Sequence, residues 1–240
     1  MIRLAATLLT LLAAPAAQAE LVTHAVVRYG DGSFTSDEHF GAASASAELL
    51  YSGPGLFHGS AQAAAAYGTV SATATVLGVN AAYPVNIAQA EAAFRDTLTI
   101  SGPAGAGFVI YTYEVGGWSE GEQSLGALFL RHGSDPDEEI SDEIGGPGAF
   151  ASLPHGIIFG QPFSHGVVLQ ANGGIGLGQT GEFGSELTAT MTGLEVFDAA
   201  MNPVGQFVVE SASGTRYPVP SPAGALLLVL AAAMTGRSRQ

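Results

Sequence analysis

The residues most able to do chemistry form an acidic run over residues 134–143. Its six carboxylates are those of Asp135, Asp137, Glu138, Glu139, Asp142 and Glu143. Calcium binds about six to eight oxygen ligands and relieves repulsion among such groups, so the run is a candidate calcium site. The EF-hand spacing is absent, because Pro136 separates the first two aspartates and no glycine stands at the sixth position. A run of like charge also forms a solvated loop without metal, and both interpretations stay open.

The histidines offer a second kind of metal site. The chain has 6, at His24, His39, His58, His132, His155 and His165. None shows the i, i+4 pair of a helical zinc site. His155 and His165 open segments that we interpret as neighbouring strands, so two histidines could meet there across strands. The alternative is that they are ordinary surface residues at strand ends.

Catalytic groups are few. The chain has no cysteine and no Gly-x-Ser-x-Gly elbow. A glycosidase needs two carboxylates on facing strands, and only Asp96 and Glu114 stand apart from the turns. The alternative for both residues is a charge at a strand end. Asp96 could also form a polar pair with Arg95. Trp118, the single tryptophan, either stacks on a sugar or anchors a loop in the core. We predict no catalytic residues and no enzyme.

A glycine pattern that resembles a nucleotide-binding fingerprint lies at Gly176, Gly178 and Gly181. The residues that follow alternate like a strand, so no helix N-terminus is expected to receive a pyrophosphate. The pattern therefore favours a glycine-rich hairpin.

The elements that must position these residues are predicted to be strands. Period-two alternation places Ala66, Val70, Ala72, Ala74 and Val76 on one face, although residues 61–66 also suit a helical turn. Residues 88–100 alternate too, except at Asp96, where either a bend or a buried partner is required. The apolar phase slips at Gly193, which suggests a bulge.

About ten such strands, separated by Gly/Pro turns, predict an all-β, antiparallel β-sandwich or jelly-roll-like single domain. Alanines and threonines on the inward faces predict thin, closely packed sheets.

Composition limits the partners. Residues 20–219 hold four arginines against all 21 acidic residues, which leaves a net charge of −17, and the chain has no lysine. Such a polyanion is a poor ligand for nucleic acid or an anionic membrane surface, and divalent cations suit it better. Calcium is therefore the one cofactor considered.

The patterns at both ends of the chain predict targeting signals. Residues 1–19 begin with a basic Met1-Ile2-Arg3, continue through an apolar run and end in Ala17-Gln18-Ala19 before Glu20. This is the pattern of a secretory signal peptide, so the mature chain is expected to begin near Glu20. We predict a domain over residues 20–216.

The C-terminal tail, residues 217–240, has three parts. A proline-rich breaker comes first, then an apolar run over residues 223–236 that predicts a helix shorter than a membrane span, then a basic end. The residues that mark it are Val219, Pro220, Ser221, Pro222, Arg237 and Arg239. A plain C-terminal anchor and a core segment are the alternatives.

This tail resembles the PEP-CTERM sorting signal of Gram-negative exoproteins, in which a Val-Pro-Glu-Pro-like motif precedes a short apolar helix and an arginine-rich terminus. Ser221 stands where that family has glutamate, and two spaced arginines replace the cluster. The resemblance implies an exosortase-type membrane protease as partner, transient insertion of the tail into the inner membrane, and delivery to the cell surface or extracellular matrix.

We therefore expect a secreted, structural or adhesive surface protein in an exopolysaccharide or biofilm context. The alternative is a calcium-assisted carbohydrate-binding module.

Overall fold

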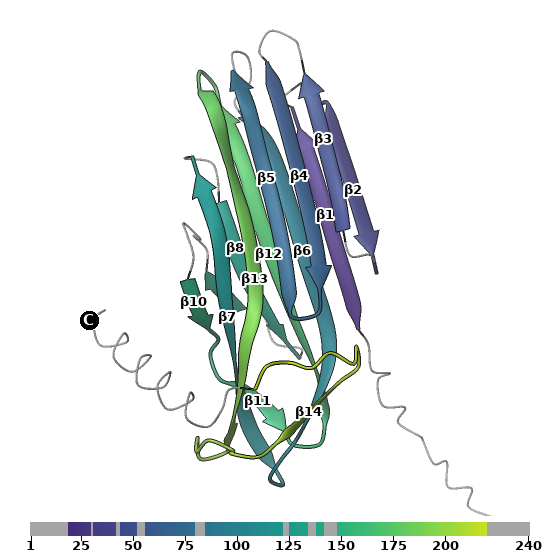
Figure 1. Ribbon diagram of the computed structural model, residues 1–240, viewed down its shortest axis with the longest axis vertical. Helices are drawn as coiled ribbons and strands as arrows, with labels where there is room; N and C mark the ends of the chain where they lie inside the picture. The colour runs from purple at the N-terminus through teal and green to yellow at the C-terminus, as the bar shows by residue number, and fades with distance from the viewer. Residues whose placement is uncertain are drawn as a thin grey trace, which may run out of the picture.

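The protein is an antiparallel β-sandwich of two packed sheets (Figure 1). The computed structural model describes residues 19–29, 31–41, 44–51, 56–79, 85–121, 125–133, 138–141 and 148–219. Within these ranges every regular element is a strand, and each sheet has 7 strands. The predicted all-β class is confirmed. The predicted signal peptide, apart from Ala19, and the predicted tail beyond Val219 lie outside the described residues.

The first sheet, which we call sheet A, is built around the long strand β6. Its order is β2 (Phe34–Phe40), β1 (Glu20–Arg28), β6 (Val85–Ser101), β12 (Pro162–Gly176), β8 (Leu125–His132) and β9 (Glu138–Ser141), with β14 (Val208–Ser211) also paired to β6. β14 pairs with β6 beyond the stretch that β1 covers.

The second sheet, sheet B, is built around β7 and β13. Its order is β10 (Gly148–Ala151), β7 (Ala106–Glu120), β13 (Thr180–Asp198), β5 (Thr69–Val79), β4 (Phe57–Ala66) and β3 (Ser44–Tyr51), with β11 (His155–Ile158) also paired to β7. From β5 to β8 the chain changes sheet at every connection.

The core between the sheets contains many small side chains. The buried alanines that face it are Ala25, Ala61, Ala63, Ala65, Ala72, Ala74, Ala88, Ala90, Ala92, Ala171 and Ala189. At Gly173 of β12 the two sheets meet backbone to backbone, because a Cβ there would lie 2.8 Å from the Ala74 carbonyl oxygen of sheet B. Small residues are therefore what allow the close packing that the sequence predicts.

The predicted facing of β5 is confirmed for Val70, Ala72, Ala74 and Val76, which are all buried. Ala66 is exposed, so its assignment to the same face is wrong. The reason is the hairpin turn at residues 67–68, which ends β4 and starts β5 in the opposite phase. Residues 61–66 form a strand and not a helical turn.

The prediction of about ten strands is too low, because the described residues contain 14. β2 escapes notice since most of its residues are polar or charged. β9 lies within the acidic run, so the expectation of a loop throughout residues 134–143 is wrong for Glu138–Ser141.

The bulge expected at Gly193 is confirmed. The pairing of β13 with β7 shifts register between Met191 and Gly193, which leaves Thr192 as the extra residue. The shift moves Leu194 and Val196 onto the buried face.

Among the described residues no helix has the length and apolar character needed to cross a membrane.

Candidate functional site

The most unusual feature of the interior is a layer of ionisable and hydroxyl side chains, which we call the polar layer. Its members are Asp96, Tyr111, Tyr113, His132, His155, His165 and Tyr217. It lies toward the end of the sandwich where β11 and β14 are found, the lower end in Figure 1.

Asp96 is fully buried on the inner face of β6. It keeps the phase of Phe94 and Leu98, which are buried as well, and β6 continues through it without a break. Of the two alternatives, a bend or a buried partner, the structure shows the partner. That partner is not Arg95, which is exposed and donates to Ser164 Oγ at 3.0 Å.

Donors from the C-terminal segment surround the Asp96 carboxylate. Ser211 Oγ and Ser213 Oγ each donate to Oδ2 at 2.6 Å, and the Tyr217 hydroxyl donates to the same oxygen at 2.8 Å. The backbone N–H groups of Thr97 and Ser213 donate to Oδ1 at 2.8 and 3.1 Å. Burial by itself raises the pKa of Asp96, but the hydrogen bonds from Ser211, Ser213 and Tyr217 outweigh it and hold the pKa below its ordinary value.

His165 lies beside Asp96, on the neighbouring strand β12. On its other side His165 is paired in register with His132 of β8. Asp96, His165 and His132 thus form one row across sheet A. The expectation that His155 and His165 open neighbouring strands is wrong, because β11 pairs within sheet B and β12 within sheet A. Sequence reasoning chose the wrong partner because connection order does not reveal which sheet a strand joins.

His165 is completely buried, and its Nε2 lies 3.0 Å from the Tyr113 hydroxyl. Its Nδ1 is buried and has no hydrogen-bond partner among the described residues. Burial, reinforced by the neighbouring His132 and His155, lowers the pKa of His165 to about 3 against the pull of Asp96. The ring is therefore neutral at neutral pH.

His132 connects the two sheets. Its Nε2 donates to the Gly156 carbonyl at 3.2 Å, since a carbonyl only accepts. In the neutral ring Nδ1 then accepts from the Tyr111 hydroxyl, 3.0 Å away.

Ring stacking holds the layer together. Tyr111 stacks on His165 with centroids 4.1 Å apart, and His132 stacks on His155 at 4.6 Å. Burial raises the pKa of both Tyr111 and Tyr113 well above the ordinary value, so both remain protonated donors. The layer thus links the two sheets through specific polar contacts, which fix their mutual position.

In the parts of the chain that the structure describes, no three histidine or carboxylate side chains are arranged to hold an ion.

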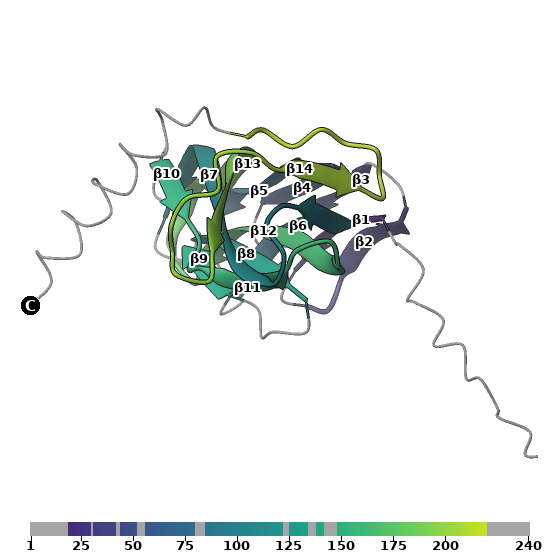
Figure 2. The same ribbon diagram turned by 90° about the horizontal axis from the view of Figure 1, so that it is seen from below.

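The C-terminal segment closes this end of the sandwich. Figure 2 shows β14 and the chain that follows it, in yellow-green, running along this end of the molecule. Tyr217 is buried in the core cluster, so the domain extends one residue past the predicted boundary at 216. Sequence reasoning counted Tyr217 as tail because three prolines follow; its acceptor, Asp96, lies 121 residues away. Pro218 and Val219 are exposed.

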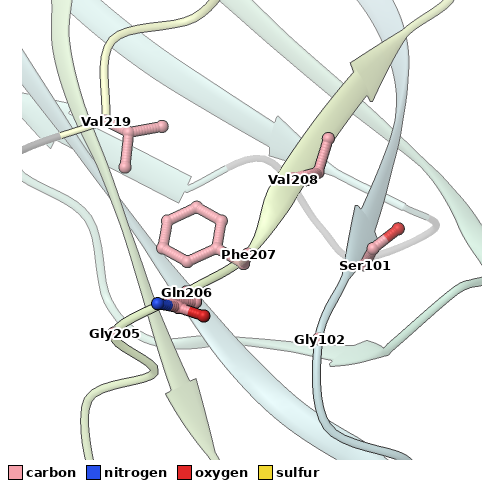
Figure 3. Close-up of a pocket in the computed structure, with 7 residues that line it drawn as sticks. All are labelled: Ser101, Gly102, Gly205, Gln206, Phe207, Val208 and Val219. Atoms are coloured by element: carbon pink, nitrogen blue, oxygen red, sulfur yellow. The ribbon is translucent and has the colours of Figure 1, made fainter.

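A groove of about 540 Å³ lies beside this segment, with Val219 in its wall (Figure 3). It is lined by Ser101, Gly102, Gly205, Gln206, Phe207, Val208 and Val219. Figure 3 shows the Phe207 ring and the Val219 side chain on the same side of the groove. These lining residues include no ionisable group, so they supply no acid or base for catalysis.

Other predicted site residues lie apart. Asp96 points into the interior from sheet A, whereas Glu114 is exposed on sheet B, so they do not face each other. Trp118 is 37% exposed on β7, and its Nε1–H donates to Glu186 Oε2 at 3.3 Å. The idea that Trp118 anchors a loop in the core is therefore wrong. Gly176, Gly178 and Gly181 surround the β12–β13 hairpin, and a strand follows them, as expected.

The proposed calcium and sorting residues are only partly described. Glu138 and Glu139 belong to β9, whose backbone pairs with β8, while Asp135, Asp137, Asp142 and Glu143 lie outside the described residues. Of the sorting motif, Val219 is described, whereas Pro220, Ser221, Pro222, Arg237 and Arg239 are not.

Sequence reasoning missed most of the polar layer. One available signal was the phase of β7, in which Tyr111 and Tyr113 fall in step with Val109 and Val115, all four buried. A scan against protein-family models finds no match for the chain, and a search of curated proteins finds no significant match either.

Proposed function

We propose that the protein is a secreted structural or adhesive protein of the cell surface or extracellular matrix, in an exopolysaccharide context. A signal peptide directs its export, and a C-terminal signal directs its sorting. An exosortase-type membrane protease is the processing partner, and the apolar helix over residues 223–236 enters the inner membrane of a Gram-negative bacterium before cleavage. The sandwich, which we class as jelly-roll-like from its sheet-changing connections, is the part delivered.

The observation that carries this proposal is where the fold ends. Tyr217 is buried and bound to Asp96, whereas Pro218 and Val219 are exposed. The last described core contact therefore comes immediately before the proline-rich motif. A protease that cuts within residues 220–222 would leave the contacts of Tyr217 intact, so tail removal and domain stability are compatible.

The test is to delete residues 223–240 and fractionate the producing cells. The expected result is a folded protein that is exported but no longer attached to the surface. A matched variant, Pro220→Ala with Pro222→Ala, keeps the helix and basic end and tests the motif alone. An unchanged surface fraction after the deletion contradicts the proposal.

The second candidate is a calcium-assisted carbohydrate-binding module. The exposure of Trp118 favours it, since an accessible indole can stack on a sugar ring.

The test of this candidate is thermal melting with calcium. If the acidic run binds calcium, a calcium concentration a hundredfold above the dissociation constant adds about 2.7 kcal/mol to the free energy of unfolding. The melting temperature should then rise in calcium, and Asp137→Asn should remove most of the rise. Identical melting curves in calcium and EDTA contradict this candidate.

A further inference from the structure

The arginines of the described strands all lie in one sheet, whereas exposed carboxylates lie on both. Three arginines lie in sheet A, at Arg28, Arg95 and Arg131, and Arg216 lies in the C-terminal segment. The described strands of sheet B contain no arginine, and the chain has no lysine. Sheet B instead presents exposed carboxylates at Glu48, Glu114, Glu120, Glu182 and Glu186. Its outer surface, which we call the acidic face, therefore attracts cations over its whole area.

The acidic face is open over its central strands. Figure 1 shows β4, β5 and β13 toward the viewer, with no other described segment drawn across them above the β4–β5 turn. Hydroxyl and amide groups fill the space between the carboxylates, and Ser60 Oγ lies 2.8 Å from Thr75 Oγ1 across two strands. These hydroxyl and amide groups both donate and accept hydrogen bonds.

One row on this face combines every group that a charged sugar requires. Strand register places Gln62, Thr73, Glu186 and Trp118 side by side on four adjacent strands. At a spacing of about 4.8 Å per strand, the row is about 14 Å long. Gln62, Trp118 and Glu186 are exposed, and Thr73 is half-buried.

Trp118 is held for stacking by its neighbours. The indole N–H donates to Glu186 Oε2, which orients the ring, and the carboxylate keeps lone pairs for a second donor. Beside it in the next row is Gly116, where an added Cβ would meet no atom within 4 Å. The space over Gly116 is therefore open to a ligand that extends past Trp118.

We propose that the acidic face binds a cationic polysaccharide, a polymer of amino sugars with free ammonium groups. The apolar face of a sugar ring packs on Trp118, and an adjacent ammonium group is attracted by Glu186 and by the indole itself. Thr73 and Gln62 bond the sugar hydroxyls. An anionic polymer is repelled by the same carboxylates, and a neutral one makes no use of their charge. This inference rests on the proposed function, because it names the class of polysaccharide that the surface protein meets.

The experiment is isothermal titration of the full chain with a β-1,4-linked glucosamine hexamer in mildly acidic, low-salt buffer. The fully N-acetylated hexamer is the control ligand. We expect the glucosamine hexamer to bind and the acetylated one to bind far more weakly. Glu186→Gln should weaken binding about fivefold, which is the loss expected when one of the strongest exposed ion pairs is removed. Trp118→Ala should weaken it by a similar factor.

The matched control variant is Glu38→Gln, which removes the same charge from an exposed position on β2 of sheet A. It should leave binding unchanged, and unchanged thermal melting of all three variants shows that each is folded. Equal weakening by Glu38→Gln and Glu186→Gln would mean attraction by net charge alone and overturns the proposal. Equal binding of both hexamers, or of neither, also overturns it. These outcomes leave the sorting proposal standing, because surface attachment and tail cleavage are measured separately.

Discussion

At the scale of single residues, the polar layer is the feature with the clearest physical consequences. Asp96 and His165 are both fully buried and adjacent across two strands, yet their environments act in opposite directions. Hydrogen bonds keep Asp96 charged, while burial keeps His165 neutral. The pH dependence of stability should reveal this difference.

Acidification should destabilise the fold through His165. Its folded-state pKa of about 3 lies below the ordinary value of 6.5, so the unfolded chain takes up the proton first as the pH falls. Stability from this group is full above pH 6.5 and is lost progressively toward pH 3. The loss between pH 7 and pH 5 should be about 2 kcal/mol, measured by urea unfolding.

The variant His165→Gln removes the titrating group but keeps a partner for Tyr113. Between pH 7 and pH 5, the free energy of unfolding of this variant should fall by about 2 kcal/mol less than that of the wild type. His24→Gln on β1 is the control and should retain the wild-type dependence. A His165→Gln profile parallel to that of the wild type would show that this ring does not control the acid response.

The Asp96 carboxylate should matter more for stability than any exposed acid. Asp96→Asn places an amide N–H among donors from Ser211, Ser213 and Tyr217, and the cost should be about 3 kcal/mol. Tyr217→Phe removes a single bond and should cost about half as much. Both variants should make the C-terminal segment more sensitive to protease.

The control for these two variants is Glu210→Gln, an exposed charge on β14 next to the same segment. If Asp96→Asn unfolds at the same urea concentration as Glu210→Gln, the network of donors contributes no net stability.

At the scale of elements, the sandwich depends on strands that keep one small apolar face inward. β5 shows this most plainly, because Val70 is 1% exposed while Thr73 faces outward on the same strand. The sheets approach each other closely at Gly173, so the space between them admits only small side chains there.

Charge substitutions on β5 should therefore differ sharply. Val70→Asp places an unpaired charge in the core and should cost about 4 kcal/mol or more. Thr73→Asp should change stability by about 0.5 kcal/mol, since the side chain meets water. The two free energies of unfolding, measured in urea, decide the point, and equal values would show that the facing is not what governs the response.

Period-two patterns predicted the fold class because each strand of a two-layer sandwich has one buried face. They also located the bulge at Gly193 and the exception at Asp96, where the choice between a bend and a buried partner stayed open. They failed where pairing is set by distant residues. His132 meets His165 and Tyr217 meets Asp96 only because of strand order, which local sequence does not encode. β2 was missed because an edge strand with Asp37 and Glu38 lacks an apolar face to detect.

At the scale of the whole molecule, the polar layer and the acidic face lie in different parts of the fold. The end with β11 and β14 contains the polar layer, the groove and Val219, the exposed start of the proposed sorting motif. All the described arginines lie outside sheet B, so the acidic face carries no positive charge from arginine. This arrangement suits a delivered domain whose attachment signal leaves from one end while its broad face remains accessible.

The most direct test of this account is the intact mass of the protein extracted from the cell surface. We predict a species that begins near Glu20 and lacks the residues beyond the Pro220–Pro222 region, because both signals have been removed. The double variant at Pro220 and Pro222 should retain the mass of the tail. A surface species from wild-type cells that still ends at Gln240 would contradict sorting and identify the tail as a plain anchor.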